Sequence, residues 1–194
     1  MTARTTPALL EREAELEELQ AALEAASRGT GSLVVVEGPA GIGKTRLLAS
    51  ARETAERTGL RVLSARGTEL ERDFPFALVG QLFGPVVHEA SEAEREELLD
   101  AAARLAGPVV GIESEGSPVD EDAGYLPDQS FEILNALYWL TSNLGERGPA
   151  LLAVDDAHWS DQASLRFLIF LLPRLGDLPV ALALTVRTGE VGAA

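Results

Sequence analysis

Residues 33–45 read Leu33-Val34-Val35-Val36-Glu37-Gly38-Pro39-Ala40-Gly41-Ile42-Gly43-Lys44-Thr45. The first four form a continuous apolar run, which is typical of a strand covered on both faces. The last eight match the whole phosphate-binding pattern G-x-x-x-x-G-K-[ST], and residues 45–58 have the pattern of a helix. This order of strand, glycine-rich turn and helix places backbone N–H groups and a helix N-terminus around an anion. The stretch therefore predicts an α/β fold with a phosphate-binding loop after a buried strand.

Lys44 is the only lysine in a chain that has fifteen arginines. In the phosphate-binding pattern a lysine ammonium reaches the β and γ phosphates, whereas the rigid guanidinium of arginine fits that pocket poorly. The hydroxyl of Thr45 is predicted to bind Mg²⁺. A glycine-rich turn without a ligand is the alternative interpretation, and the flanking strand and helix argue against it. We therefore predict that nucleotide is held by Gly38, Pro39, Ala40, Gly41, Ile42, Gly43, Lys44, Thr45 and Arg46.

A second motif consists of the apolar run Leu151-Leu152-Ala153-Val154 followed by the acids Asp155 and Asp156. This is the Walker B arrangement. Asp155, at the carboxyl end of the strand, is predicted to hold Mg²⁺ directly or through water, and Asp156 to orient or deprotonate the attacking water. Many P-loop ATPases carry glutamate at the second position, and aspartate is one methylene shorter, so slow hydrolysis is expected. The alternative interpretation is a strand followed by an aspartate-rich turn.

Arg187 closes the strand predicted at 180–186, at the edge of the sheet where such folds bind nucleotide. Two interpretations stay open for Arg187: a sensor of the γ-phosphate with a catalytic role beside Lys44 and Asp156, or a surface arginine. His158 either polarises water or belongs to a structural turn, and Trp159 is expected to pack.

Helices and strands alternate along the rest of the chain. Helices are predicted at 11–26, 45–58, 76–88, 92–105, 130–144 and 163–175, and further strands at 61–65, 151–154 and 180–186. Ser91 and Glu94 have the spacing of a capping box. Residues 107–129 are acidic and contain no basic residue, which predicts a mobile loop. We expect one domain over 1–194 with a parallel sheet, preceded by an N-terminal arm and helix over 1–30.

The net charge of the chain limits the classes of partner that it can bind. It has 31 acidic and 16 basic residues, a formal net charge of −15. Such a surface repels nucleic acid and anionic membranes, so neither is expected as a direct partner. No apolar run reaches the roughly eighteen residues of a membrane-spanning helix, and no secretory segment follows the first residues. The absence of cysteine excludes disulfides and thiolate metal sites. A cytoplasmic location is expected.

Several motifs besides the phosphate loop carry a family resemblance: Leu9-Leu10-Glu11-Arg12-Glu13-Ala14-Glu15-Leu16, Ala65-Arg66-Gly67-Thr68-Glu69-Leu70-Glu71-Arg72, Gln81-Leu82-Phe83, Tyr138-Trp139-Leu140, Asp155-Asp156-Ala157-His158-Trp159-Ser160-Asp161 and Val186-Arg187-Thr188-Gly189-Glu190. Together they resemble the nucleotide-binding domain of large ATP-binding LuxR-family transcriptional regulators, which are AAA+-like ATPases of the STAND type. The resemblance implies a three-layer P-loop NTPase of the ASCE class with a mostly parallel sheet ordered 5-1-4-3-2. It also implies that Arg12 lies near the base, although the family's usual glycine before that arginine is Glu11 here.

In that family the module precedes a helical lid, a helical-repeat region and a helix-turn-helix. This sequence ends at Ala194, after its fourth predicted strand. The resemblance therefore implies that the fifth strand and the lid are missing, and that residues 33–36 form an unprotected apolar edge. Without a lid, ATP binding is expected to be micromolar or weaker, with little turnover. The implied partners are the later domains and, depending on the nucleotide, a second copy of the chain.

The function implied is a regulatory switch that binds ATP or ADP with Mg²⁺. One alternative is a stand-alone nucleotide or small-molecule kinase, which needs a second substrate pocket and lid arginines that clamp the transferred phosphoryl group. The acidic residues 107–129 make a poor lid of that kind. A second alternative is a protein-interaction module that keeps the loop as a relic.

Overall fold

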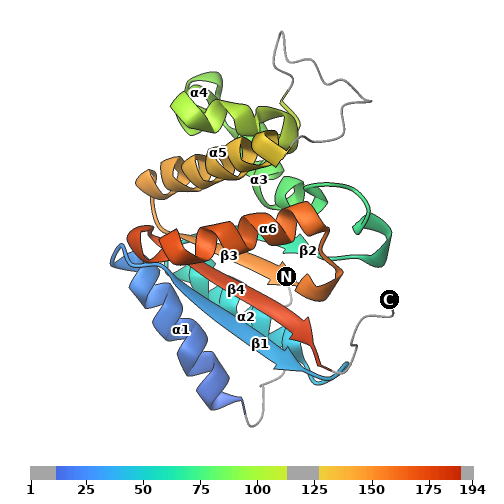
Figure 1. Cartoon of the computed structure of the whole chain (residues 1–194). Helices are drawn as coiled ribbons and strands as arrows, with labels where there is room; N and C mark the ends of the chain where they lie inside the picture. Colours follow the sequence, from blue (N-terminus) through green and yellow to red (C-terminus); the bar gives the residue numbers. More distant parts are fainter. Residues whose placement is uncertain (1–11, 113–126, 189–194) are drawn as a thin grey trace, which may run out of the picture.

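The computed structural model describes residues 12–112 and 127–188, with residues 127–130 described by their backbone alone. Four strands form one sheet: β1 (Ser32–Gly38), β2 (Arg61–Arg66), β3 (Ala150–Asp155) and β4 (Val180–Arg187). Their order is β1-β4-β3-β2, and every neighbouring pair is parallel. All four carboxyl ends therefore lie at one edge of the sheet, marked by the arrow tips in Figure 1. The predicted parallel α/β fold and the 1-4-3-2 part of the predicted order are confirmed.

Helices cover both faces of the sheet, which gives three layers (Figure 1). One outer layer consists of α1 (Glu13–Ser27) and α2 (Lys44–Arg57). The other is built from α3 (Ala77–Glu89), α5 (Pro127–Glu146) and α6 (Gln162–Leu171), with α4 (Glu92–Leu98) packed against α3 and α5. Short 3-10 helices are η1 (Glu69–Glu71), η2 (Ala101–Val110), η3 (Ala157–Trp159) and η4 (Leu172–Asp177). Within the described ranges, no helix has the length and apolar character needed to cross a membrane.

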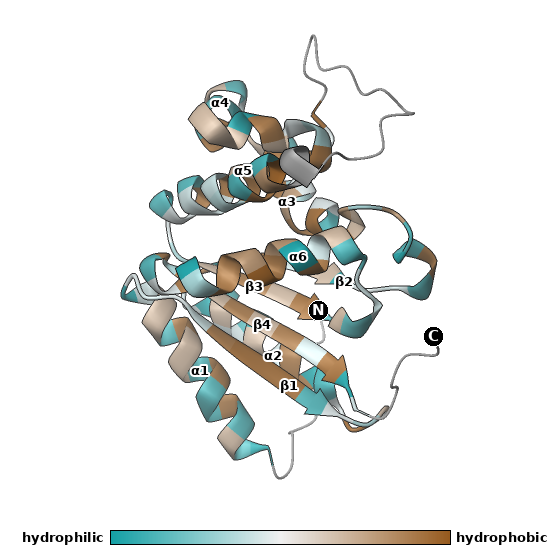
Figure 2. Ribbon diagram, in the orientation of Figure 1, coloured by the Kyte–Doolittle hydropathy of each residue, from teal (hydrophilic) through white to brown (hydrophobic). Residues whose placement is uncertain are grey.

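Two apolar clusters hold the layers together, one on each face of the sheet. β3 is buried along its whole length because it lies between two strands and beneath both layers. On the α6 side, the rings of Phe83 and Phe167 meet edge to face with centroids 6.0 Å apart, and both side chains are fully buried. In Figure 2 β1 and β4 are brown along most of their length, and polar colour marks their tips. Apolar packing thus fixes the sheet and leaves its carboxyl edge to polar side chains.

β1 lies at an edge of the sheet, which corrects the prediction that residues 33–36 are covered on both faces. Val36 is buried against the layer of α1 and α2, and Val34 packs there too. The alternate side chains of Leu33 and Val35 point to the opposite face and are 38% and 48% exposed. A run of apolar residues does not distinguish a central strand from an edge strand, because strand order depends on tertiary packing. Among the described strands β1 has β4 as its one neighbour, which is the edge position that the family resemblance implies.

Most predicted segments agree with the structure to within two residues at each end, the helix predicted at 130–144 begins three residues earlier, and three other segments differ more. The helix predicted at 92–105 stops at Leu98, and the chain continues as η2, which Asp100 caps by accepting from the N–H of Ala101 at 2.7 Å. The helix predicted at 163–175 stops at Leu171, because Pro173 lacks the N–H that would continue it. The acidic loop predicted at 107–129 is too long at both ends, since 107–110 belong to η2 and 127–129 to α5. Residues 113–126 of that prediction lie outside the described residues.

The predicted capping box at the start of α4 is present. Ser91 Oγ accepts from the Glu94 N–H at 3.4 Å, and Glu94 Oε2 accepts from the Ser91 N–H at 2.9 Å. Glu94 also forms an ion pair with Arg147, which reaches it from beyond the end of α5. The hydrogen bonds from Ser91, followed by the contacts with Arg147, lower the pKa of Glu94 from 4.5 to about 2. This carboxylate therefore joins α4 to the chain that follows α5.

Glu94→Gln is expected to remove the part of the free energy of unfolding that depends on the ionisation of this carboxylate. Because the pKa of Glu94 is lower in the folded chain, its ionised form stabilises the fold above pH 4.5, and this contribution is lost as the pH falls toward about 2. Urea unfolding across that pH range measures the effect. Glu96→Gln, an exposed glutamate on the same helix, is the matched control. A Glu94→Gln curve with the wild-type pH dependence would contradict this assignment.

Candidate nucleotide-binding site

The predicted phosphate loop connects the end of β1 to the start of α2. Gly41 and Gly43 have φ of 79° and 96°, in the left-handed region that glycine adopts without strain. α2 begins at Lys44, so its first N–H groups and its positive dipole end face the loop. No described residue accepts a hydrogen bond from the backbone N–H of Gly41, Ile42 or Gly43. These donors are available to an anion.

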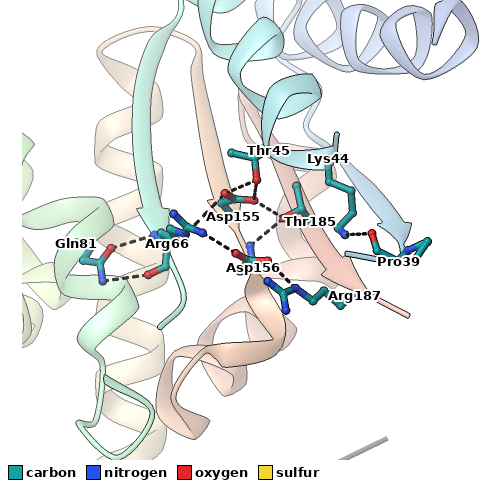
Figure 3. Close-up of polar contacts among 9 residues, drawn as sticks. All are labelled: Pro39, Lys44, Thr45, Arg66, Gln81, Asp155, Asp156, Thr185 and Arg187. Atoms are coloured by element: carbon teal, nitrogen blue, oxygen red, sulfur yellow. Dashed lines mark hydrogen bonds and ion pairs between the residues drawn. The ribbon is translucent and has the colours of Figure 1, made fainter. Parts of the chain in front are cut away.

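The side chain of Lys44 lies beside this loop and is 8% exposed. Its Nζ donates to the carbonyl oxygens of Gly38 at 2.8 Å and Pro39 at 3.0 Å. Figure 3 shows the ammonium next to Pro39, on the same side of the site as the end of β1. An ammonium has three donors, so one remains for a phosphate oxygen. The structure thus holds the only lysine of the chain where the loop's N–H groups lie.

Asp155 joins the loop to the centre of the sheet. Thr45 Oγ1 donates to Asp155 Oδ2 at 2.9 Å, and Thr185 Oγ1 of β4 donates to Asp155 Oδ1 at 2.6 Å (Figure 3). Asp155 is 7% exposed and Thr185 is fully buried. The two side chains predicted to hold Mg²⁺, Thr45 and Asp155, are 110 positions apart in sequence and in direct contact here.

Asp156 faces two arginines across the carboxyl edge of the sheet. Its Oδ2 lies 3.1 Å from Arg66 Nη2, and its Oδ1 lies 3.6 Å from Arg187 Nε. The backbone of Asp156 is left-handed with φ of 51°, a conformation that aspartate tolerates better than most residues. Its N–H donates to Thr185 Oγ1 at 2.8 Å, which fixes this conformation. The structure therefore brings Arg187 to the second acid, while a contact of Arg187 with the γ-phosphate stays a prediction.

Arg66 and Thr185 are site residues that the sequence reasoning missed. Arg66 ends β2, is paired with Asp155 in the register of β2 and β3, and places its Nε 3.9 Å from Asp155 Oδ2. The side-chain amide of Gln81 on α3 accepts from the Arg66 N–H at 2.9 Å and donates to the Arg66 carbonyl at 3.3 Å. Arg66 could have been found from its position in the sequence, because the last residue of the strand next to β3 must lie beside the acids that end β3.

Arg66→Gln is expected to strengthen the apparent binding of Mg²⁺ in the presence of ATP by about threefold, because the guanidinium competes with the metal for the same carboxylates. The gain is modest since the Arg66 side chain is 63% exposed and water screens its charge. The apparent Mg²⁺ affinity is measured by adding Mg²⁺ stepwise at a fixed ATP concentration and recording the Tm at each step. Arg61→Gln, an exposed arginine on the same strand, is the matched control. Unchanged or weaker Mg²⁺ binding in Arg66→Gln would show that no competition exists.

Arg12 and Arg46 occupy opposite flanks of the loop sequence. Arg12 Nη2 donates to the Ile42 carbonyl at 3.1 Å, and Arg12 Nη1 donates to Glu15 at 2.6 Å. The guanidinium of Arg12 therefore supports the loop itself, and its predicted contact with the base stays a prediction. Arg46 is exposed in the first turn of α2, where its N–H donates to the Gly43 carbonyl at 3.1 Å. Its role in holding nucleotide also stays a prediction.

The donor set fits a magnesium ion shared with a nucleotide. The described part of the chain contains no group of three or more His, Cys, Asp and Glu side chains that could hold a metal alone. Mg²⁺ prefers one or two carboxylates completed by waters and phosphate oxygens, and Asp155 with Thr45 is such an incomplete set. His158 and Trp159 follow in η3 with ring centroids 5.2 Å apart, which places the histidine in a structured turn beside the acids.

Comparisons with known proteins agree with this geometry. The chain is 30% identical over 193 residues to an uncharacterized protein of Rhizobium meliloti (strain 1021), in a match that covers 92% of the chain and 18% of that protein. Its fold is similar to that of the ORC2 protein of Aeropyrum pernix, solved in complexes with ADPNP and ADP. That similarity has a TM-score of 0.50 and 18% identity, and covers 96% of this chain and 44% of the ORC2 chain. The sequence profile of the AAA ATPase domain matches residues 8–184. The chain belongs to the AAA ATPase domain family.

Proposed function

We propose that the chain is a Mg·ATP-binding switch module with slow ATP hydrolysis. The observation that carries this proposal is the contact of 2.9 Å between Thr45 Oγ1 and Asp155 Oδ2. It joins the hydroxyl that ends the phosphate loop to the acid that ends β3, which is the arrangement a shared Mg²⁺ requires. The membership of the AAA ATPase domain family supports the same ligand.

Each side chain of the site has a proposed role. Residues 38–45 hold phosphate oxygens through their N–H groups, and Lys44 adds a positive charge. Thr45 and Asp155 hold Mg²⁺, which when bound neutralises charge on the phosphates. Asp156 orients the attacking water and accepts its proton. Because Arg66 and Arg187 already engage the Asp156 carboxylate, this acid must release at least one partner before it acts, which supports slow turnover.

We further propose that the module belongs to a multidomain transcriptional regulator of the LuxR type in the cytoplasm. The motifs shared with that family support this, and the chain spans only 18% of the length of its relative from Rhizobium meliloti. In this role ATP and ADP favour different forms of the protein, and helical-repeat and DNA-binding domains elsewhere in the polypeptide respond to the difference. Self-association that depends on the nucleotide is part of the same proposal.

Asp155→Ala tests the metal site. Mg·ATP is expected to raise the Tm of the wild-type chain more than ATP with EDTA does, because a ligand that binds only the folded state stabilises it. In Asp155→Ala this difference between ATP with and without Mg²⁺ is expected to disappear. The exposed Asp177→Ala is the matched control, and Mg·GTP measured alongside shows which base is preferred. A Mg²⁺ effect of wild-type size in Asp155→Ala would overturn the assignment.

A further inference from the structure

A cavity of about 600 Å³ is lined by residues of the chain that precedes α3, of the start of α6 and of α5. Its lining includes Arg72, Pro75, Phe76, Leu134, Ser160 and Arg166. None of the proposed nucleotide-binding residues is among its lining residues. The volume lies within the range of roughly 300–1,000 Å³ that is usual for small-molecule sites.

Asp161, one of the lining residues, is held by three backbone hydrogen bonds. Asp161 is 3% exposed, and its Oδ1 accepts from the N–H groups of Phe76 and Ser164, each at 2.8 Å. Its Oδ2 accepts from the N–H of Leu78 at 3.3 Å. One carboxylate thereby ties the start of α3 to the start of α6 and holds the buried Phe76 in a left-handed conformation with φ of 61°. A ligand that enters the cavity meets a preformed surface, which lowers the entropy lost on binding.

Ser160 contributes a buried hydroxyl next to the cavity. It is one of the lining residues and is 4% exposed, and its Oγ is closed to solvent and has no hydrogen bond within the described residues. A buried hydroxyl without a partner is unusual in a native fold and unfavourable, because it has lost its water without gaining a hydrogen bond.

Two cations lie at the rim. Arg72 and Arg166 are exposed, and neither forms an ion pair with any residue that the structure describes. The lining holds two arginines and two aspartates, and of these Asp161 is buried whereas Asp73 is exposed beside the two arginines. On a chain with a net charge of −15, the exposed groups of this lining carry one more positive than negative charge. Together with the apolar walls of Pro75 and Leu134, this excess favours an anion that has an apolar body.

We propose that this cavity binds a small organic carboxylate with an apolar chain or ring. The carboxylate pairs with Arg72 and Arg166 at the rim, where guanidinium groups form charge-assisted hydrogen bonds with such anions. The apolar body lies between Pro75, Phe76 and Leu134. The proposal does not depend on nucleotide binding, because the site shares no residue with the phosphate loop.

Octanoate is a suitable probe, with octanamide as its uncharged analogue. Amide chemical shifts of the isotope-labelled chain, measured without nucleotide, report both the affinity and the place of binding. Octanoate is expected to shift the amides of Phe76, Ser160 and Ala163 in a saturable way. Octanamide is expected to bind about tenfold more weakly or worse, because it lacks the charge that the arginines recognise. Equal binding of the two probes, or shifts confined to other residues, would overturn the proposal.

Two variants test separately the contribution of the rim arginines and that of the space inside the cavity. Arg72→Gln/Arg166→Gln changes exposed side chains only and is expected to weaken octanoate binding about tenfold, whereas the exposed pair Arg57→Gln/Arg104→Gln is expected to leave it unchanged. Ala163→Leu, in the first turn of α6, places extra methyl groups in the cavity and is expected to abolish binding of the probe. Octanoate that binds Arg72→Gln/Arg166→Gln as tightly as wild type would contradict a carboxylate site, and unchanged binding to Ala163→Leu would show that the probe lies outside this cavity.

Discussion

Lys44→Ala is expected to weaken Mg·ATP binding by about a hundredfold. The ammonium lies beside the phosphate loop, held by the carbonyl oxygens of Gly38 and Pro39, and the chain has no second lysine. Its removal deletes charge-assisted hydrogen bonds to phosphate oxygens, each worth about 1.5–3 kcal/mol, and about 1.4 kcal/mol corresponds to a factor of ten in affinity. Isothermal titration with Mg·ATP measures the change.

Arg57→Ala is the matched control for this variant. Arg57 ends the same helix, is exposed, and its replacement changes the net charge by the same amount. Its ATP affinity is expected to stay within about twofold of wild type, because surface charges contribute little. The Tm of Lys44→Ala without nucleotide is also expected to stay near wild type, since water can reach the carbonyls that the ammonium leaves. An ATP affinity of Lys44→Ala equal to that of Arg57→Ala would contradict the assigned role.

Asp161→Ala is expected to lower the free energy of unfolding by about 3 kcal/mol. The carboxylate of Asp161 accepts three hydrogen bonds, from the N–H groups of Phe76, Leu78 and Ser164. Leaving a buried N–H without a partner costs about 1–3 kcal/mol, and part of the total is offset because a charge no longer has to be buried. Urea unfolding followed by circular dichroism measures the difference.

Two further variants test this explanation. Asp161→Asn keeps one oxygen acceptor and presents an amide to the remaining N–H groups, so its loss of stability is expected to be about half as large. Asp177→Ala removes an exposed aspartate at the end of η4 and is expected to change stability by less than about 0.5 kcal/mol. If Asp161→Ala unfolds at the same urea concentration as Asp177→Ala, the three hydrogen bonds do not hold α3 and α6 together.

The part of the site that depends on local sequence could be predicted. Gly41, Gly43 and Lys44 belong to a continuous pattern, in which each residue acts on the same few atoms of backbone and ligand. Asp155 could be placed because an acid directly after a buried strand must lie at the carboxyl edge of the sheet. Thr45 and Asp155 then meet because β1 and β3 both end at that edge.

The remaining features depend on which strands are neighbours. Arg66 reaches Asp156 only because β2 lies next to β3, and Thr185 reaches Asp155 only because β4 lies on the other side. The exposed face of Leu33 and Val35 has the same cause, since β1 lies at an edge. Residue patterns indicate which segments are buried but not which strands are neighbours, because the packing of the whole sheet sets the strand order. The order 1-4-3-2 was expected only through the family resemblance.

The contacts of Asp161 show a further limit of prediction from the sequence. A cap at the start of α6 can be read from its position before the helix, and it does accept from the Ser164 N–H as a cap should. Its contacts with Phe76 and Leu78 cross 85 and 83 positions of sequence and follow only from the packing of α3 on α6. No local pattern indicates that one carboxylate serves two helices.

Protection of Lys44 by nucleotide tests the account most directly. An amine-selective reagent can modify only the N-terminus and Lys44, so mass spectrometry gives both labelling rates from one sample. At a Mg·ATP concentration about ten times the Kd, labelling of Lys44 is expected to slow about tenfold relative to the N-terminus. In Asp155→Ala at the same Mg·ATP concentration, this protection is expected to be largely lost. Equal labelling of Lys44 with and without saturating Mg·ATP would contradict the proposal that this loop binds the nucleotide.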